Sequence, residues 1–295
     1  MKKAVFTGAG VAIVTPMNAD SSVNYPKLGE LLDFQLKGGI DAVIACGTTG
    51  EASTLTHEEH IEVIRFTVEY VKGRVPVIAG VGGNNTRHAA QLSKEAEQAG
   101  ADALLHVTPY YNKTSQTGLI RHFFTVCDAS SLPVILYNVP SRTALNIAPE
   151  TYLKLCEHPN IAATKEACGD ISLIARTASL CGDNLVIYSG NDDQIVPIMS
   201  LGGKGVISVL ANIAPRQTHD LCRLYLEGKT AESAKMQLDL LDLMNALFID
   251  VNPIPVKAAM AFMGYDCGEC RMPLAPMQES GLAVLKAAMK KHGLI

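Results

Sequence analysis

Lys165 lies near the end of a run of apolar residues, Ile161–Ala167, whose composition is that of a short buried strand. Pro159 precedes the run and Gly169 follows it, so turn residues stand on both sides. Burial disfavours the ammonium form of a lysine, which lowers its pKa and leaves a free amine that can attack a carbonyl. Taken alone, the pattern equally fits a strand-end lysine that reaches solvent or pairs with Glu166.

Polar residues also follow the other apolar runs of the chain, and most of them carry hydroxyls or are glycines. They are Thr15, Gly47–Glu51, Asn84–Asn85, Thr108–Asn112, Tyr137–Asn138, Ser189–Asp192 and Ser208. This set contains no metal triad and no histidine–cysteine nucleophile pair. It suits amine catalysis on a carbonyl, in which hydroxyl groups pass protons. A barrel that only binds ligands, with ordinary capping groups at its strand ends, is the alternative.

The elements that must position these residues are short, nearly continuous apolar runs separated by segments of helical period. The runs are Gly10–Thr15, Ala42–Cys46, Val75–Val81, Ala103–Thr108, Val134–Val139, Ile161–Lys165, Leu185–Tyr188 and Gly205–Leu210. Continuous apolar runs are typical of parallel strands that are covered on both faces. Helical spacing is evident in Tyr25–Lys37, His57–Val71 and Thr86–Ala99, the last with Thr86 as its expected cap. The alternation predicts an α/β fold, a (β/α)8 TIM barrel.

Beyond Asn212 the pattern becomes helical only. Helices are expected at Thr218–Leu226, Ala231–Phe248, Pro255–Met263 and Ala283–Lys291. We therefore expect a catalytic barrel in residues 1–223 and a C-terminal helical region in residues 224–295. In such barrels the catalytic groups lie at the carboxyl ends of the strands, which is where the polar residues stand.

Composition narrows the class of protein. The net charge of −4 and the absence of a Lys/Arg cluster argue against a nucleic-acid partner. No stretch reaches the roughly 20 apolar residues of a membrane helix, so we expect a cytoplasmic protein without a membrane partner. The eight cysteines lie mostly in apolar runs, and Cys267 and Cys270 have no second CxxC pair to complete a metal site. A metal or redox site at this pair is therefore not expected.

Several short motifs, in their order and spacing, resemble one known group of proteins. They are Ala12–Pro16, Gly47–Glu51, Thr108–Lys113, Tyr137–Thr143, Lys165–Glu166, Asn252–Lys257 and Arg271–Leu274. Together they are similar to the pyruvate-dependent class I aldolase superfamily and, within it, to the 4-hydroxy-tetrahydrodipicolinate synthase (dihydrodipicolinate synthase) family. The resemblance extends over essentially the whole chain.

The resemblance implies a Schiff-base lyase that condenses pyruvate with aspartate 4-semialdehyde on the pathway to lysine, without a cofactor. It implies that Lys165 forms the iminium with pyruvate and that Tyr137 relays protons. Thr48 would link Tyr137 to Tyr111, which members of this family receive from the neighbouring subunit. A homotetramer built as a dimer of dimers follows from the same resemblance.

Substrate-binding roles also follow from matched positions. The resemblance assigns Thr49 to the pyruvate carboxylate and Arg142 to the carboxylate of the semialdehyde or product. Gly190 and Ile207 match positions that shape the floor of the pocket.

Some members of the family bind lysine as an inhibitor at a subunit interface. His57, His60, Asn84 and Tyr110 match positions of that effector site, whereas His88 stands where sensitive enzymes place an acidic residue. Loss of a carboxylate that pairs with the effector's amine weakens binding. We therefore expect a weak response to lysine or none.

Three other readings are weighed against this one. Sister aldolases, such as N-acetylneuraminate lyase or a 2-keto-3-deoxy sugar acid aldolase, share the lysine and the tyrosine, but Arg142 and the Asn252–Lys257 string favour the synthase. A non-catalytic keto-acid sensor needs no proton relay. A nucleotide-binding protein fails because Gly80–Gly83 lacks the third glycine of GxGxxG and Gly202–Gly205 lacks the Walker spacing.

Overall fold

The computed structural model describes residues 2–295. Eight parallel strands pair in sequence order, and the last pairs with the first, so the sheet closes into a barrel. The strands are β1 Gly8–Ala12, β2 Ala42–Ala45, β3 Val77–Gly80, β4 Ala103–Val107, β5 Val134–Asn138, β6 Ile161–Glu166, β7 Val186–Ser189 and β8 Gly205–Ser208. The predicted (β/α)8 fold is confirmed.

Each strand lies within or beside its predicted run, but several end earlier than expected. The sequence predicts strand ends at Thr15, Val81 and Leu210, but Thr15 and Val81 lie in the loops after β1 and β3, and Leu210 begins a 3-10 helix after β8. These residues are nonetheless buried, which is why hydrophobicity extended the predicted strands. The Thr15 hydroxyl, for example, donates a hydrogen bond to the carbonyl of Gly50 in the loop after β2, at 2.7 Å. The loops at this end of the barrel are thus fixed to one another.

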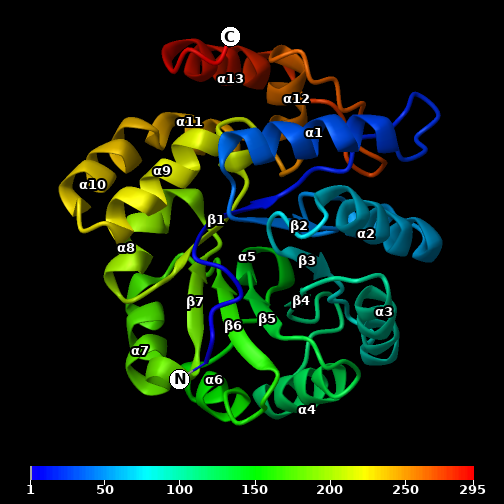
Figure 1. The fold of residues 1–295 in the computed structure, drawn as a ribbon, viewed down its shortest axis with the longest axis vertical. Helices are drawn as coiled ribbons and strands as arrows, with labels where there is room; N and C mark the ends of the chain where they lie inside the picture. The colour runs from blue at the N-terminus through cyan, green and yellow to red at the C-terminus, as the bar shows by residue number, and fades with distance from the viewer. Residues whose placement is uncertain (1) are drawn as a thin grey trace.

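The helices surround the barrel on its outside, except for the short α5, Pro140–Thr143, which lies near the centre of the view (Figure 1). They are α1 Tyr25–Gly38, α2 His57–Val71, α3 Thr86–Gln98, α4 Gln116–Cys127, α5 Pro140–Thr143, α6 Pro149–Leu155, α7 Ile171–Cys181, α8 Ile195–Ser200, α9 Pro215–Leu226, α10 Thr230–Asp239, α11 Leu241–Ala246, α12 Ile254–Phe262 and α13 Glu279–Lys291. The short 3-10 helices are η1 Ala52–Thr54, η2 Gly182–Asn184, η3 Asp192–Gln194 and η4 Leu210–Asn212. Within residues 2–295, no helix is long and apolar enough to cross a membrane.

Two helical predictions need correction. The expected helix 231–248 is divided into α10 and α11 at Leu240, where ψ is −1° and the buried side chain reaches the core. The cap of α3 is Asn85 rather than Thr86, because the Asn85 side chain accepts from the backbone N–H groups of Arg87 and His88.

The C-terminal helices α12 and α13 lie on the outside of the molecule beside α1 and α11 (Figure 1). A buried ion pair between Lys257 of α12 and Glu51 connects this region to the loop after β2. The division into a barrel, 1–223, and a helical region, 224–295, remains a proposal about folding units.

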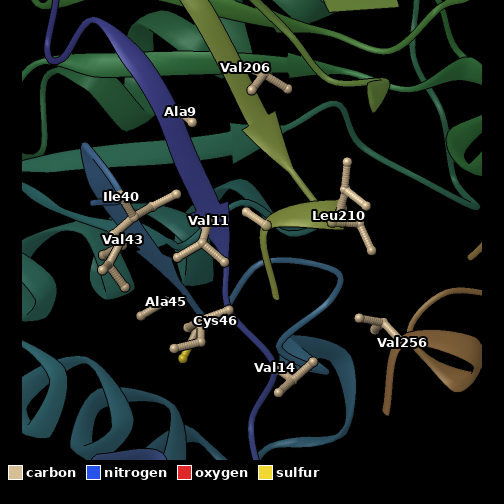
Figure 2. Close-up of a cluster of buried hydrophobic side chains, with 14 of the residues drawn as sticks. Ala9, Val11, Val14, Ile40, Val43, Ala45, Cys46, Val206, Leu210 and Val256 are labelled. Carbon is tan, nitrogen blue, oxygen red and sulfur yellow. The ribbon is translucent and has the colours of Figure 1, made fainter. Parts of the chain in front are cut away.

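The apolar core has two layers, one inside the barrel and one between the barrel and its helices. Figure 2 shows part of the outer layer, where Val11 of β1, Val43 of β2 and Val206 of β8 lie among side chains from the following loops. The inner layer includes Ala163 and Ala167. Because side chains alternate along a strand, Lys165 of β6 faces the barrel interior together with these two alanines.

Candidate active site

Lys165 is the penultimate residue of β6 and is only 5% exposed. Its Nζ lies 4.4 Å from the centroid of the Tyr137 ring, at the carboxyl end of the barrel. Burial lowers the pKa of Lys165 to about 8; the charge of Asp192 opposes this shift, and the charge of Arg142 adds to it. A substantial fraction of this amine is therefore neutral near neutral pH, in the form that attacks carbonyls.

Glu166 faces the other side of β6 and does not pair with Lys165. The Tyr152 hydroxyl donates to its carboxylate, and the Asn138 amide donates to Oε2 at 3.2 Å. Burial raises the pKa of Glu166 to about 6, while these hydrogen bonds act in the opposite direction. The solvent-reaching or Glu166-paired lysine considered from the sequence is therefore not what the structure shows.

The lowered pKa of Lys165 predicts the pH dependence of imine formation. Only the neutral amine attacks pyruvate, so the rate of imine formation should rise about tenfold per pH unit below pH 8 and level off above it. Rapid-quench borohydride trapping between pH 6 and pH 10 measures this rate. A rate that keeps rising up to pH 10, as expected for an unperturbed lysine, would contradict the assignment.

Tyr137 is the neighbour of Lys165 across the sheet, since the two residues pair in the register of β5 and β6. Burial raises the pKa of its phenol, whereas the charge of Arg142 and a hydrogen bond with the Thr48 side chain lower it. Thr48 stands in the turn after β2, on the opposite side of the barrel mouth. The structure thus brings Lys165, Tyr137 and Thr48 together from three separate loops or strands.

Thr49 and Arg142 are connected through Asn252, the first residue of the Asn252–Lys257 motif, to which we assigned no role in the site from the sequence. The Asn252 side-chain amide donates to Thr49 Oγ1 at 3.0 Å. Arg142 Nη2 donates to the Asn252 backbone carbonyl, also at 3.0 Å. A polar residue just before the apolar segment of α12 was the available signal, but its contacts span 203 and 110 residues of sequence.

Gly190 directly follows β7, and Ile207 lies in β8. A Cβ atom on Gly190 would lie 2.8 Å from the Ala167 Cβ and 2.9 Å from the Glu166 carbonyl oxygen, so a larger residue is excluded there. Ile207 is fully buried inside the barrel. Their role as the floor of a pocket remains a prediction that this geometry permits.

Tyr111 does not reach the other site residues within one chain. It has a positive φ of 68° and its side chain is 92% exposed. Tyr110 is also exposed, and its backbone carbonyl accepts from the Asn84 side chain at 3.2 Å. A tyrosine held in such a conformation on a loop, without packing partners in its own chain, is typical of a residue that contacts another subunit.

A cavity of about 390 Å³ extends from Thr48, Tyr137 and Arg142 to the residues matched to the effector site. Its lining includes His57, His60, Asn84, His88 and Tyr110. His88 Nε2 lies 3.3 Å from His57 Nδ1, and His57 Nε2 lies 2.6 Å from Glu95 Oε2. Burial lowers the pKa of His60, whose Nε2 lies 2.7 Å from the Gly80 carbonyl oxygen.

Comparison with known proteins gives consistent matches along the chain. The model of the Dihydrodipicolinate synthetase family matches residues 5–292. A 4-hydroxy-tetrahydrodipicolinate synthase of Lachnoclostridium phytofermentans is 59% identical over 293 residues, which cover 99% of this chain and 100% of the relative. One of Acetivibrio thermocellus is 56% identical over 295 residues and covers 100% of both chains.

Among solved structures, a dihydrodipicolinate synthase of Acinetobacter baumannii in complex with pyruvate has the same fold. The TM-score is 0.96 at 41% sequence identity, and the match covers 98% of this chain and 99% of that chain. The similarity therefore includes both the barrel and the C-terminal helices.

Proposed function

Since the chain belongs to the dihydrodipicolinate synthetase family, we propose that it condenses pyruvate with L-aspartate 4-semialdehyde, the reaction of 4-hydroxy-tetrahydrodipicolinate synthases. The chain is a lyase of the Schiff-base class I aldolase type and acts in lysine biosynthesis. The observation that carries the proposal is the buried Lys165, whose Nζ lies against the Tyr137 ring at the mouth of the barrel.

The reaction starts with attack of the neutral Lys165 amine on the pyruvate ketone. The carbinolamine takes up a proton and loses the ketone oxygen as water, which leaves an iminium between Lys165 and the substrate carbon. The iminium withdraws electrons, so the pyruvate methyl group loses a proton and becomes an enamine carbon nucleophile. This carbon attacks the aldehyde, the amine of the semialdehyde closes the ring, and Lys165 is released.

Five other residues support these steps. Tyr137 transfers protons at the carbinolamine and the alkoxide, with Thr48 holding its hydroxyl. Thr49 binds the pyruvate carboxylate, and the Asn252 amide orients its hydroxyl. Arg142 binds the carboxylate of the semialdehyde, and its hydrogen bond to Asn252 holds the guanidinium at the mouth of the barrel.

Substrate specificity distinguishes the synthase from its sister aldolases, which use the same lysine. The purified protein should consume pyruvate only when aspartate 4-semialdehyde is present. It should not cleave N-acetylneuraminate or a 2-keto-3-deoxy sugar acid. Cleavage of either sugar acid at a comparable kcat/KM would move the assignment to a sister aldolase.

We also propose that the active site is completed by a second copy of the chain, which supplies Tyr111. The exposed Tyr111 of one protomer would insert beside Thr48 of its partner, which its own chain leaves open to the cavity. A homotetramer formed by two such dimers, located in the cytoplasm, is the assembly we propose.

Mixing two inactive variants tests the sharing of Tyr111. Lys165→Met removes the amine, and Tyr111→Ala removes the tyrosine, so each homodimer should have little activity. A mixed dimer contains one site with both groups, and co-refolded mixtures should recover about a quarter of wild-type activity at equal ratios. Mixtures that stay at the activity of the separate variants would show that Tyr111 acts within its own chain.

The effector region predicts a weak response to lysine. No acidic side chain lines the 390 Å³ cavity in residues 2–295, and His88 stands where the resemblance expects an acidic residue in lysine-sensitive enzymes. Lysine should therefore not inhibit strongly at up to low-millimolar concentration, measured with the coupled turnover assay. His88→Glu should lower the inhibitory concentration of lysine by about tenfold, because a carboxylate then pairs with the amine. Strong inhibition of the unmodified protein at these concentrations would contradict this prediction.

A further inference from the structure

Asp192 is a buried carboxylate that the proposed mechanism does not use. It opens η3, directly after β7, and is only 3% exposed. Its Oδ2 accepts from the backbone N–H groups of Val209 at 3.1 Å and Leu210 at 2.9 Å, just beyond β8. Its Oδ1 is buried and has no hydrogen-bond partner within residues 2–295. Ser208 and the two backbone amides stabilise the carboxylate, but Oδ1 itself has no partner in hydrogen-bond geometry within the described residues.

The position of Asp192 places its charge beside the reacting lysine. Lys165 pairs in register with Tyr188 of β7, and Asp192 follows four residues later in the chain. Because Asp192 also bonds to the chain just beyond β8, its carboxylate lies over the carboxyl ends of two strands, next to β6. Of the charges that act on Lys165, Asp192 has the largest effect, and it favours the cationic form of the lysine.

We propose that Asp192 is the buried counter-charge of Lys165, stabilising the positive charge that persists on the nitrogen after it has formed the iminium with the keto acid. This inference rests on the proposed imine chemistry and deepens it. A cation inside a barrel loses most of its hydration, so a fixed negative charge nearby lowers the free energy of the iminium and of the transition states that lead to it. Asp192 touches neither substrate nor leaving water, so it is a positioning residue that acts through Lys165.

Other titratable groups face the same region and must be considered in any pH experiment. Tyr137 from β5 and Arg142 from α5 act near Lys165, and Cys222 from α9 lies near Asp192. Burial raises the pKa of Asp192, whereas its hydrogen bonds with Ser208 and the two backbone amides and the charge of Lys165 lower it. Arg142 and Tyr137 are unchanged in an Asp192 variant. A shift in the pH dependence of imine formation in that variant therefore reports on the charge of Asp192.

The test compares Asp192→Asn with the matched control Asp193→Asn. Asparagine keeps an acceptor for the amides of Val209 and Leu210 but removes the charge. The control removes the same charge from the exposed neighbour. In a plot of the rate of imine formation against pH, the rising part at low pH is the acid limb. Asp192→Asn should move this limb to lower pH by about one unit, because Lys165 then loses its proton more easily. Turnover should nevertheless fall about tenfold or more, since the iminium is no longer stabilised.

The outcomes distinguish an effect of the Asp192 charge from a loss of the loop structure that Asp192 holds. Asp192→Glu should restore the position of the acid limb, and Asp193→Asn should leave it within about 0.2 pH unit of wild type. A variant Asp192→Asn that loses melting temperature and turnover but keeps the wild-type acid limb would overturn the proposal. It would show that Asp192 only holds the loop after β8.

A measurement on the unmodified protein covers the case in which Asp192→Asn does not fold. The imine formed with 13C-labelled pyruvate should be protonated at pH 8 and above, which its carbon chemical shift reports. A neutral imine in that range would contradict the counter-charge. If the unmodified protein forms no adduct at all, the proposed function fails instead, so the two failures are distinguishable.

Discussion

Replacing Lys165 by methionine is expected to lower kcat/KM for pyruvate by at least about 10³-fold and to abolish the borohydride-trapped adduct. The methionine side chain has a similar length and fills the same buried position beside Tyr137, but it has no nucleophile. Because the buried Asp192 then loses the positive charge of Lys165, the melting temperature should fall rather than rise. Turnover, adduct mass and thermal unfolding measured on one preparation check the three parts of the result.

The matched control is Lys154→Met. Lys154 is an exposed lysine of α6 that forms an ion pair with Glu157. This variant should keep wild-type turnover, because Lys154 lies outside the barrel. Residual activity of Lys165→Met within tenfold of wild type would mean that the chemistry does not pass through this amine.

Replacing Tyr137 by phenylalanine is expected to lower kcat by about 10²- to 10³-fold, the range of general acid–base catalysis. The ring that packs against the Lys165 Nζ at 4.4 Å remains, so the KM for pyruvate should change little. Steady-state kinetics with both substrates separates these two parameters. The accumulation of carbinolamine or of untrapped ketone in rapid-quench samples would show which proton transfer has become slow.

Tyr188→Phe is the control for Tyr137→Phe. Tyr188 is also a buried tyrosine inside the barrel, but its hydroxyl donates to the Phe6 carbonyl at 2.6 Å and belongs to the packing of the N-terminal segment. Loss of this hydroxyl should lower stability rather than turnover. Equal losses of turnover in the two variants would remove the special role assigned to the Tyr137 hydroxyl.

Local sequence patterns were sufficient to predict the barrel, because each strand is buried on both faces and is therefore a nearly continuous run of apolar residues. Lys165 could be singled out for the same reason, since a charged group at the end of such a run is unusual. Which face of β6 it occupies could not be read with certainty, because Lys165 and Glu166 are adjacent and both are buried. The structure places Glu166 on the outer face, where Tyr152 of α6 binds it.

Long-range contacts were beyond the reach of sequence patterns. The Asn252–Thr49 hydrogen bond joins residues 203 positions apart, and no local signal marks either residue as the partner of the other. The hydrogen bonds of the Asp192 carboxylate to Val209 and Leu210 form only once the fold brings the ends of β7 and β8 together, so the sequence alone does not reveal them. We propose a contact of Tyr111 with Thr48 between two chains, and such a contact is not visible in the sequence or in the structure of one chain.

Trapping with borohydride in the presence of pyruvate tests the central claim most directly. Peptide mass mapping then locates the adduct, and turnover with aspartate 4-semialdehyde is measured on the same preparation. We predict a reduced pyruvate adduct on Lys165 together with turnover that depends on the semialdehyde. An adduct without such turnover would keep the imine chemistry but assign the protein to a sister aldolase or a keto-acid sensor. The absence of an adduct on Lys165 would contradict the account.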